Sequence, residues 1–198
     1  MIETVREKAP HPYDVIVYVL LLTGMRRGEC CGLNWSDIDY DSCTISIRRS
    51  LCTIPGNGIF ESDPKTFSSN RTIKVDSDLL EILKEHKKRQ DRTAKELGNK
   101  WKKSDKIFTA CDGRMINPDT VSSWFSGFVS ENDLPSASLH SLRHTCASLM
   151  ISRGIPITTT AKRLGHSTSV TTIPVPNSNT IPVAVHTDIH EKLKSEAF

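Results

Sequence analysis

The feature that most constrains the fold is an uninterrupted apolar run, Val15–Leu22, eight residues long and including Tyr18. On a helix, such a run places apolar side chains on nearly every face, so a helix over residues 13–25 must be surrounded by other elements. Gly24 is a natural end for it. A membrane span needs about twenty apolar residues, so this run excludes a transmembrane protein. The pattern therefore predicts a globular fold built around one buried helix.

Size and charge set broad limits on function. The chain has 198 residues and a mass of 22.1 kDa, enough for one ordinary domain, or one domain with a tail. A net charge of +3 and a pI near 8.5 fit a nucleic-acid partner without demonstrating one. The first twelve residues carry both charge signs and no apolar stretch, which argues against a secretory signal. Six cysteines without a C-x-x-C pair indicate a reduced, cytosolic protein.

The first half of the chain predicts two helices followed by a small antiparallel sheet. Alternation and β-branched residues mark Cys43–Arg48 as a strand, and a turn over Pro55–Gly58 follows it. The expected elements are helices over 13–25 and 27–34 and strands over 43–48, 59–60 and 71–75. The sheet is thus inserted between Tyr40 and Val75, and the predicted fold class is mainly α with a small antiparallel β-sheet (α+β).

The second half is predicted to be helical. Helices are expected from Asp76 or Ser77, from Pro118 behind an Asn117 cap to about 130, over 138–153 and over 156–164, with a short strand over 106–109. The Lys/Arg-rich segment 84–106 has two interpretations, a solvated helix face with a loop, or a surface that contacts phosphates. Residues 167–185 are predicted to be extended, and 188–198 to be a terminal helix. The expected division is a domain over 1–173 and a divergent tail over 174–198.

Two stretches and one helix end carry residues suited to chemistry. In Thr23–Glu29, read T-G-M-R-R-G-E, an arginine follows a helix end beside glycine, where its planar fork can reach an anion. The alternative is a helix–helix turn with a surface arginine. In Leu139–Thr145, His140 and Arg143 lie three apart beside an apolar stripe, with His144 nearby. His166 follows a helix that ends at Gly165. A structural histidine is the simpler alternative for each imidazole.

Together these groups supply two guanidiniums and two imidazoles, and Lys65 lies between two predicted strands. Such a set can clamp a phosphoryl group and donate a proton to its leaving oxygen. The sequence shows no carboxylate pair or cluster of metal ligands beside it. The residues therefore favour metal-free phosphoryl transfer over a two-metal nuclease, and no cofactor or metal is expected.

The order of these motifs resembles a known family. The chain presents T-G-x-R-x-G-E, then a lysine between strands, then H-x-L-R-H-T, then L-G-H-S, and Gly32–Asp39 continues the first box. This order is similar to that of the catalytic domain of the tyrosine recombinases, the phage-type integrases, over about residues 10–173. The resemblance implies the fold of that catalytic domain and a role in DNA integration and recombination.

The resemblance also implies roles for individual residues. Two arginines of the family bind the scissile phosphate, a lysine on a strand protonates the leaving 5′-oxygen, two histidines assist, and an acidic residue supports the first box. The corresponding residues are, in that order, Arg26 and Arg143, Lys65, His140 and His166, and Glu29. Arg27 is a rival for the first arginine, but the T-G-x-R register favours Arg26.

The chain departs from the family at the nucleophile. A tyrosine is expected nine or ten residues after His166, where the chain has Val175 and Pro176. The chain's tyrosines all lie in the N-terminal quarter: Tyr13, Tyr18 and Tyr40. The first two are predicted to belong to the core, and Ser178 has no evident activating environment. Strand cleavage by this chain is therefore doubtful, and whether it is an enzyme stays open.

The partner implied by the resemblance is double-stranded DNA, with self-association or association with an intact recombinase that supplies the tyrosine. A membrane partner is not expected, and the implied location is the cytoplasm, as a bacterial or phage-encoded protein. The family carries a DNA-clamping domain before this point, so we expect a fragment or truncated product that binds DNA weakly and salt-sensitively. The alternatives are an inert DNA-binding remnant of the same fold and a basic helical interaction module.

Overall fold

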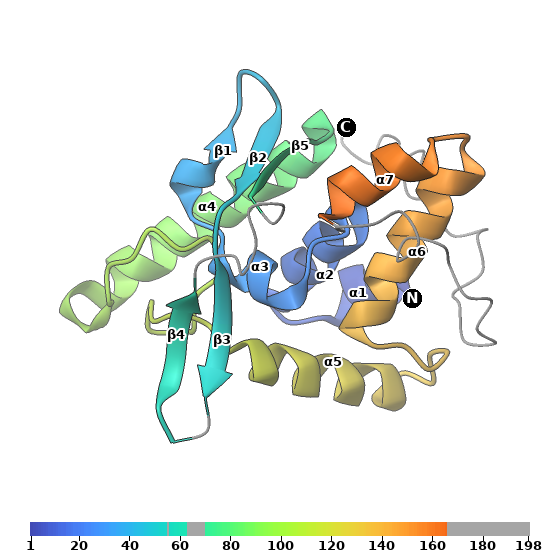
Figure 1. Cartoon of the computed structure of the whole chain (residues 1–198). Helices are drawn as coiled ribbons and strands as arrows, with labels where there is room; N and C mark the ends of the chain where they lie inside the picture. The colour runs from blue at the N-terminus through green and yellow to red at the C-terminus, as the bar shows by residue number, and fades with distance from the viewer. Residues whose placement is uncertain (55, 63–69, 166–198) are drawn as a thin grey trace, which may run out of the picture.

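The computed structural model describes residues 1–54, 56–62 and 70–165. Within these ranges no helix is long and apolar enough to cross a membrane. Figure 1 shows the helices grouped around a centre, with two small sheets beside them. The α-helices are α1 (Ile2–Lys8), α2 (Tyr13–Thr23), α3 (Arg27–Gly32), α4 (Ser77–Leu97), α5 (Pro118–Glu131), α6 (Leu139–Ser152) and α7 (Ile157–Leu164). The strands are β1 (Ile38–Asp39), β2 (Thr44–Ile47), β3 (Ser50–Ile54), β4 (Gly58–Ser62) and β5 (Arg71–Lys74).

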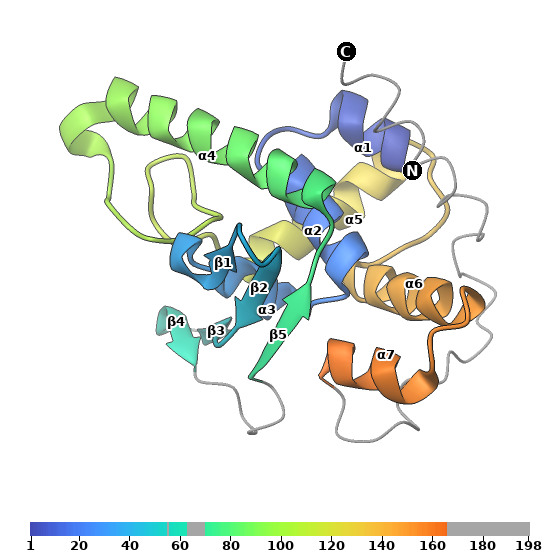
Figure 2. The same cartoon turned by 90° about the horizontal axis from the view of Figure 1, so that it is seen from above.

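Helix α2 is the centre of the core, as the apolar run predicts. Every residue from Val15 to Leu21 is buried, Tyr18 included. The helix packs against α1, α3, α4 and α6, and Figure 2 shows α2 enclosed among them. It ends at Gly24, which has a left-handed backbone with φ of 66°. The expected buried helix and its glycine end are confirmed, and this end begins the candidate site.

The strands form two antiparallel sheets rather than one. Strands β1, β2 and β5 make a three-stranded sheet, with Ile45 opposite Ile73, while β3 and β4 form a separate hairpin. The hairpin packs on α3, where a Cβ on Gly28 would lie 2.6 Å from the Leu51 carbonyl oxygen. Among the described residues, β3 pairs with β4 alone and does not extend the first sheet. The fold class is mainly α with small antiparallel sheets, as expected.

The later helices begin where the sequence indicates. The Asn117 side chain accepts a bond from the Asp119 amide at 2.8 Å at the start of α5, and Ser138 accepts one from the Ser141 amide at 3.2 Å at the start of α6. Asp76 is the N-cap residue of α4. Helix α1 was not predicted, and it buries Ile2 and Val5. The expected tail structures and the boundary near 173 lie outside the described residues.

The expected strand over 106–109 is wrong. This segment forms only isolated bridges, at Lys106 with Asn34 and at Thr109 with Met115. Its backbone runs beside the end of α3, where the Ile107 amide donates to the Leu33 carbonyl at 3.0 Å. Ile107 and Phe108 are both fully buried. The apolar pattern was therefore a correct sign of burial, but within the described part of the chain this segment pairs continuously with no strand.

Candidate phosphate-binding site

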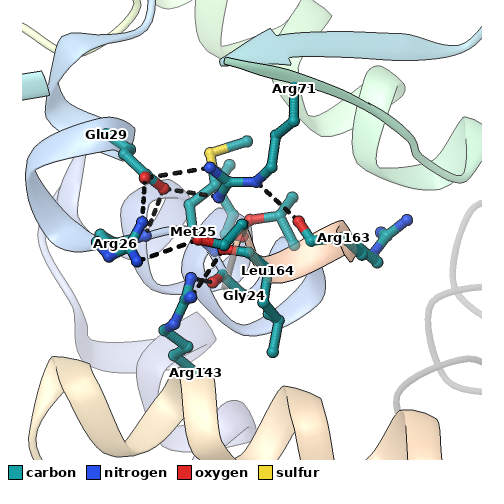
Figure 3. Close-up of polar contacts among 11 residues, drawn as sticks. Gly24, Met25, Arg26, Glu29, Arg71, Arg143, Arg163 and Leu164 are labelled. Carbon is teal, nitrogen blue, oxygen red and sulfur yellow. Dashed lines mark hydrogen bonds and ion pairs between the residues drawn. The ribbon is translucent and has the colours of Figure 1, made fainter. Parts of the chain in front are cut away.

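The structure brings Arg26 and Arg143 together where α2, α6 and α7 end or meet (Figure 3). Arg143 is buried on α6 and donates from Nη1 to the Gly24 carbonyl at 2.5 Å and from Nη2 to the Leu164 carbonyl at 2.7 Å. Arg26 lies between α2 and α3 and donates from Nη2 to the Gly165 carbonyl at 3.4 Å. The two guanidiniums thus contact neighbouring backbone positions, although they come from distant parts of the sequence.

Glu29 lies under Arg26 as a buried carboxylate. Its Oε1 accepts from Arg26 Nη1 at 2.8 Å, and its Oε2 accepts from the Arg26 backbone amide at 2.9 Å. Burial alone would raise the pKa of Glu29, but the hydrogen bonds and charge of Arg71, with those from Arg26, bring the pKa below its usual value. Glu29 is therefore ionised at neutral pH and fixes both the backbone and the side chain of Arg26.

Arg71, the first residue of β5, completes this arrangement. It donates to both oxygens of Glu29, at 3.1 and 2.7 Å, and its Nε donates to the Arg163 carbonyl at 2.7 Å. Sequence reasoning missed Arg71, because a single arginine at the start of a strand resembles any surface arginine. Only the long-range fold places it against Glu29, so no local signal was available.

Two glycines allow the elements to approach this closely. A Cβ on Gly24 would lie 2.4 Å from Leu164 Cδ2, and one on Gly165 would lie 2.9 Å from Arg71 Nη1. Both residues also have a positive φ, of 66° and 72°, which disfavours side chains. The left-handed backbone therefore favours glycine in the T-G-x-R and L-G-H motifs, where Gly24 lies against Leu164 and Gly165 lies against Arg71.

Burial and the neighbouring positive charges lower the pKa values of His140 and Arg143, which both lie on α6. Burial, and then the charge of Arg26, lower the pKa of Arg143 to about 10, so it remains cationic at neutral pH. His140 is exposed and its ring lies 4.7 Å from that of His144. Partial desolvation of His140, followed by the charges of His144, Arg143 and Arg26, lowers its pKa. His140 is therefore a neutral imidazole at pH 7, close enough to the arginines to sense their charge.

The other predicted site residues fall outside this description. Lys65, His166, Val175 and Pro176 lie outside the described residues. The rival Arg27 is directed to α5, where it donates to Ser122 Oγ at 2.6 Å and pairs with Asp119 at 3.0 Å. Arg26 is therefore the arginine of that box that reaches Arg143's surroundings.

Two of the tyrosines lie in or beside the core, and most residues of the basic segment 84–106, which begins on α4, are exposed. Tyr18 is buried, and Tyr13 is half-buried and stacks on Trp124 with ring centroids 4.4 Å apart, so both belong to or line the core as expected. Four cations of α4 form exposed pairs with acids on the same helix, which fits a solvated face: Lys84, Lys87, Lys88 and Arg89. Lys106, grouped with them by sequence, is instead buried against Glu61 and the Gly32 carbonyl.

Comparison with known proteins identifies the family. The model of the phage integrase family matches residues 1–174, so the chain belongs to the phage integrase family. It is 33% identical to the ICEBs1 integrase of Bacillus subtilis (strain 168) over 169 residues, which cover 83% of this chain and 45% of that protein. It is 32% identical to the integrase of Staphylococcus phage L54a, covering 91% of this chain and 49% of the relative. The chain spans about half the length of the curated relatives it matches.

Solved structures share the fold. The Tn1549 transposon integrase, in complex with transposon right end DNA, superposes with a TM-score of 0.76 at 20% identity, covering 100% of this chain and 63% of that one. The XerA recombinase gives a TM-score of 0.68 at 20% identity, covering 100% and 61%. These likenesses establish the fold, in agreement with the sequence expectation of a tyrosine-recombinase catalytic domain.

Proposed function

We propose that this chain is the DNA-binding catalytic domain of a site-specific tyrosine recombinase and that Arg26 and Arg143 hold the scissile phosphate. The observation that supports this is the meeting of the two guanidiniums over the carbonyls of Gly24, Leu164 and Gly165. Arg26 is 45% exposed and so is open to a phosphate from solvent. A planar guanidinium suits a phosphate because it can donate two parallel hydrogen bonds.

The proposed chemistry is metal-free phosphoryl transfer. Charge that develops on the equatorial oxygens of the phosphate would be stabilised by guanidiniums that are already fixed before DNA arrives. Arg143 is fixed by its two backbone carbonyls and Arg26 by Glu29. His140, neutral at pH 7, is suited to hydrogen bonding or proton transfer beside them. Lys65 and His166 are proposed as the remaining proton donors, on the strength of their motifs.

DNA binding is tested by a salt titration with a short duplex. We expect affinity to fall steeply as salt rises, with a slope of about 0.9 for each phosphate neutralised. Arg26→Ala should remove about one contact from that slope. Arg89→Ala is the matched control, because Arg89 is an arginine of similar exposure, 50%, on α4. If Arg89→Ala weakened binding while Arg26→Ala did not, the DNA surface would lie on α4 and the proposed site would be wrong.

We propose that this chain binds DNA without forming a covalent adduct by itself. Val175 and Pro176 stand where the nucleophile is expected, and neither side chain can attack phosphorus. A nicked suicide substrate, run on a denaturing gel, should therefore give no shifted band. Placing tyrosine at either position, Val175→Tyr or Pro176→Tyr, should give an adduct in one of them. An adduct from the unaltered chain would show that another residue reaches the phosphate.

The missing tyrosine also supports a second role, as an inert DNA-binding remnant in the bacterial cytoplasm. In that role the chain would occupy recombination sites or join an intact recombinase that supplies the tyrosine. Mixing the chain with a tyrosine-bearing relative on a suicide substrate distinguishes occupation of the sites from association with the intact recombinase. Cleavage at a half-site bound by this chain supports a shared active assembly, whereas simple inhibition supports competition.

A further inference from the structure

We propose that Arg71 is a positioning residue of the phosphate site, which sets the orientation and the available charge of Arg26 without touching the phosphate. The inference rests on the proposed function. Arg71 lies at the start of β5, outside every motif that points to the site. Its Nη1 and Nη2 both donate to Glu29 and its Nε donates to the Arg163 carbonyl, so all three of its guanidinium nitrogens are already engaged before DNA arrives. Any effect on DNA binding must therefore pass through its neighbours.

The first link is the shared carboxylate of Glu29. Oε1 accepts from Arg26 Nη1 and Arg71 Nη1, and Oε2 accepts from the Arg26 amide and Arg71 Nη2. Each oxygen of Glu29 therefore contacts both arginines. Because Glu29 is 6% exposed, water does not compete for these bonds. The bidentate contact with Arg71 fixes the plane of the Glu29 carboxylate. The orientation of that plane in turn fixes the orientation of the Arg26 side chain.

The second link is electrostatic. One carboxylate faces the guanidiniums of Arg26, Arg71 and Arg143. If Arg26 alone faced Glu29, the pair would be close to neutral and would attract an anion weakly. With Arg71 already balancing Glu29, the charge of Arg26 remains available for a phosphate.

The third link is the end of α7. Arg71 Nε donates to the Arg163 carbonyl, and Gly165, two residues later, offers its carbonyl to Arg26 Nη2. A Cβ on Gly165 would lie 2.9 Å from Arg71 Nη1, so the Arg71 guanidinium lies directly against the Gly165 backbone. Arg71 thus determines both the partner below Arg26, Glu29, and the partner beside it, Gly165.

Arg163 provides a matched control. It is also an arginine that joins separate elements, donating from Nη1 to the Lys74 carbonyl at 2.7 Å and from Nη2 to the Leu22 carbonyl at 3.5 Å. Among the described residues, its side chain forms no hydrogen bond or ion pair with Glu29, Arg26 or Arg143. A variant of Arg163 therefore reproduces a loss of cross-linking between elements without altering the carboxylate.

The experiment measures the salt dependence of duplex binding for the unaltered chain and for Arg71→Lys, Arg26→Ala, the double variant and Arg163→Lys. Lysine keeps the charge but cannot make the two-pronged contact with Glu29. We expect Arg71→Lys to lower the salt slope by about 0.9, as Arg26→Ala does. The double variant should match Arg26→Ala alone, and Arg163→Lys should keep the full slope. Melting curves place the assay temperature below the transition of every variant.

The outcomes separate this inference from the proposed function. A full slope for Arg71→Lys, or a loss that adds to that of Arg26→Ala, would overturn the positioning role while the phosphate site stands. Failure of Arg26→Ala to change the slope would overturn the proposed function, and this inference with it. If Arg71→Lys does not fold, Glu29→Gln decides, because it breaks the same link from the other side with little change in volume. Because glutamine removes the negative charge that opposes Arg26, a slope as low as that of Arg26→Ala would come from lost orientation alone and supports the positioning role, whereas a full slope overturns it.

Discussion

The cluster of Arg26, Glu29, Arg71 and Arg143 and the outer face of α4 use the same kinds of side chain in opposite ways. Glu29 and Arg71 are 6% and 7% exposed and meet at 2.7 Å. On α4, Lys88 and Glu85 are 75% and 52% exposed and lie 3.4 Å apart. Water screens the α4 pair and hydrates both charges when the pair separates. The comparison shows that a count of charged pairs predicts neither stability nor function, because burial decides what each pair does.

Burial makes the arginine cluster costly to form and specific once formed. Desolvation of Glu29 has to be offset by several hydrogen bonds, and Arg71 and Arg26 supply them. A single geometry results, which is what a binding site for a tetrahedral anion needs. The outer face of α4 does not fix its side chains in a single geometry. Its ion pairs join exposed residues one helical turn apart, and water can replace either partner.

The largest effect is expected from Arg71→Ala. Among the described residues, it leaves the buried carboxylate of Glu29 with the Arg26 contacts alone, and removing one partner of a buried pair costs about 3–5 kcal/mol. Urea unfolding should show this loss in the free energy of unfolding, with the slope against urea unchanged. A loss below 1 kcal/mol would mean that Glu29 is hydrated, and the contrast with α4 would fail.

The next effect concerns Arg143, which supports backbone carbonyls rather than a carboxylate. Arg143→Leu should lower the free energy of unfolding by about 3 kcal/mol, because the Gly24 and Leu164 carbonyls lose charged donors. Arg26→Ala, by comparison, should cost about 1 kcal/mol or less, since Arg26 is 45% exposed. Thermal unfolding of the two variants tests the difference. Equal losses would show that exposure does not separate the roles of the two arginines.

The sequence predicted local features well and long-range ones poorly. The buried helix, its Gly24 end and the caps at Asn117 and Ser138 follow from patterns within a few residues. Arg26 and Arg143 could be proposed for the candidate site because they lie in recognisable motifs. Arg71 was missed because it reaches Glu29 across 42 positions of sequence.

Lys106 is a residue whose burial could not be predicted from the sequence, again because its contacts are long-range. Its charge suggested a surface position, but its Nζ reaches the Gly32 carbonyl across 74 positions and also pairs with Glu61, which keeps it buried. Helix α1 was missed because it has only seven residues, and its two buried side chains, Ile2 and Val5, are too few to show a helical period. In each of these cases the deciding contact is tertiary, and no local pattern reports it.

The inner face of α4 is expected to behave like the arginine cluster rather than like its own outer face. His86 is buried there, its Nε2 2.8 Å from the Ile107 carbonyl and its Nδ1 2.8 Å from His11 Nε2. Burial lowers the pKa of His86 to about 4, against 6.5 for an unperturbed histidine. The unfolded chain therefore binds a proton that the folded chain excludes. Stability contributed by neutral His86 is complete above pH 6.5 and is lost as the pH falls towards 4.

This pH dependence is measured as the free energy of unfolding at pH 8, 6 and 4.5. The part due to His86 should be on the order of 1–3 kcal/mol across that interval. His86→Gln should flatten the curve between pH 6.5 and 4, because glutamine does not titrate. At pH 8 His86 is neutral in both the folded and the unfolded chain. The difference in the free energy of unfolding between His86→Gln and the unaltered chain at that pH therefore measures the lost packing against Phe108 without the proton effect. An unchanged curve for His86→Gln would assign the acid sensitivity to other groups.

The smallest effect is expected on the outer face of α4, from Lys88→Ala. The Lys88–Glu85 pair is exposed on both sides, and such a pair contributes about 0.2–0.5 kcal/mol. Alanine is also the best helix former, which offsets part of that loss, so the melting temperature should barely change. High salt should remove even this difference, because it screens exposed charges, whereas it should not remove the loss caused by Arg71→Ala. Melting curves of the two variants at low and high salt make this test. If Lys88→Ala cost as much as Arg71→Ala, or if salt erased both losses equally, the distinction between the buried cluster and the solvated helix would not hold.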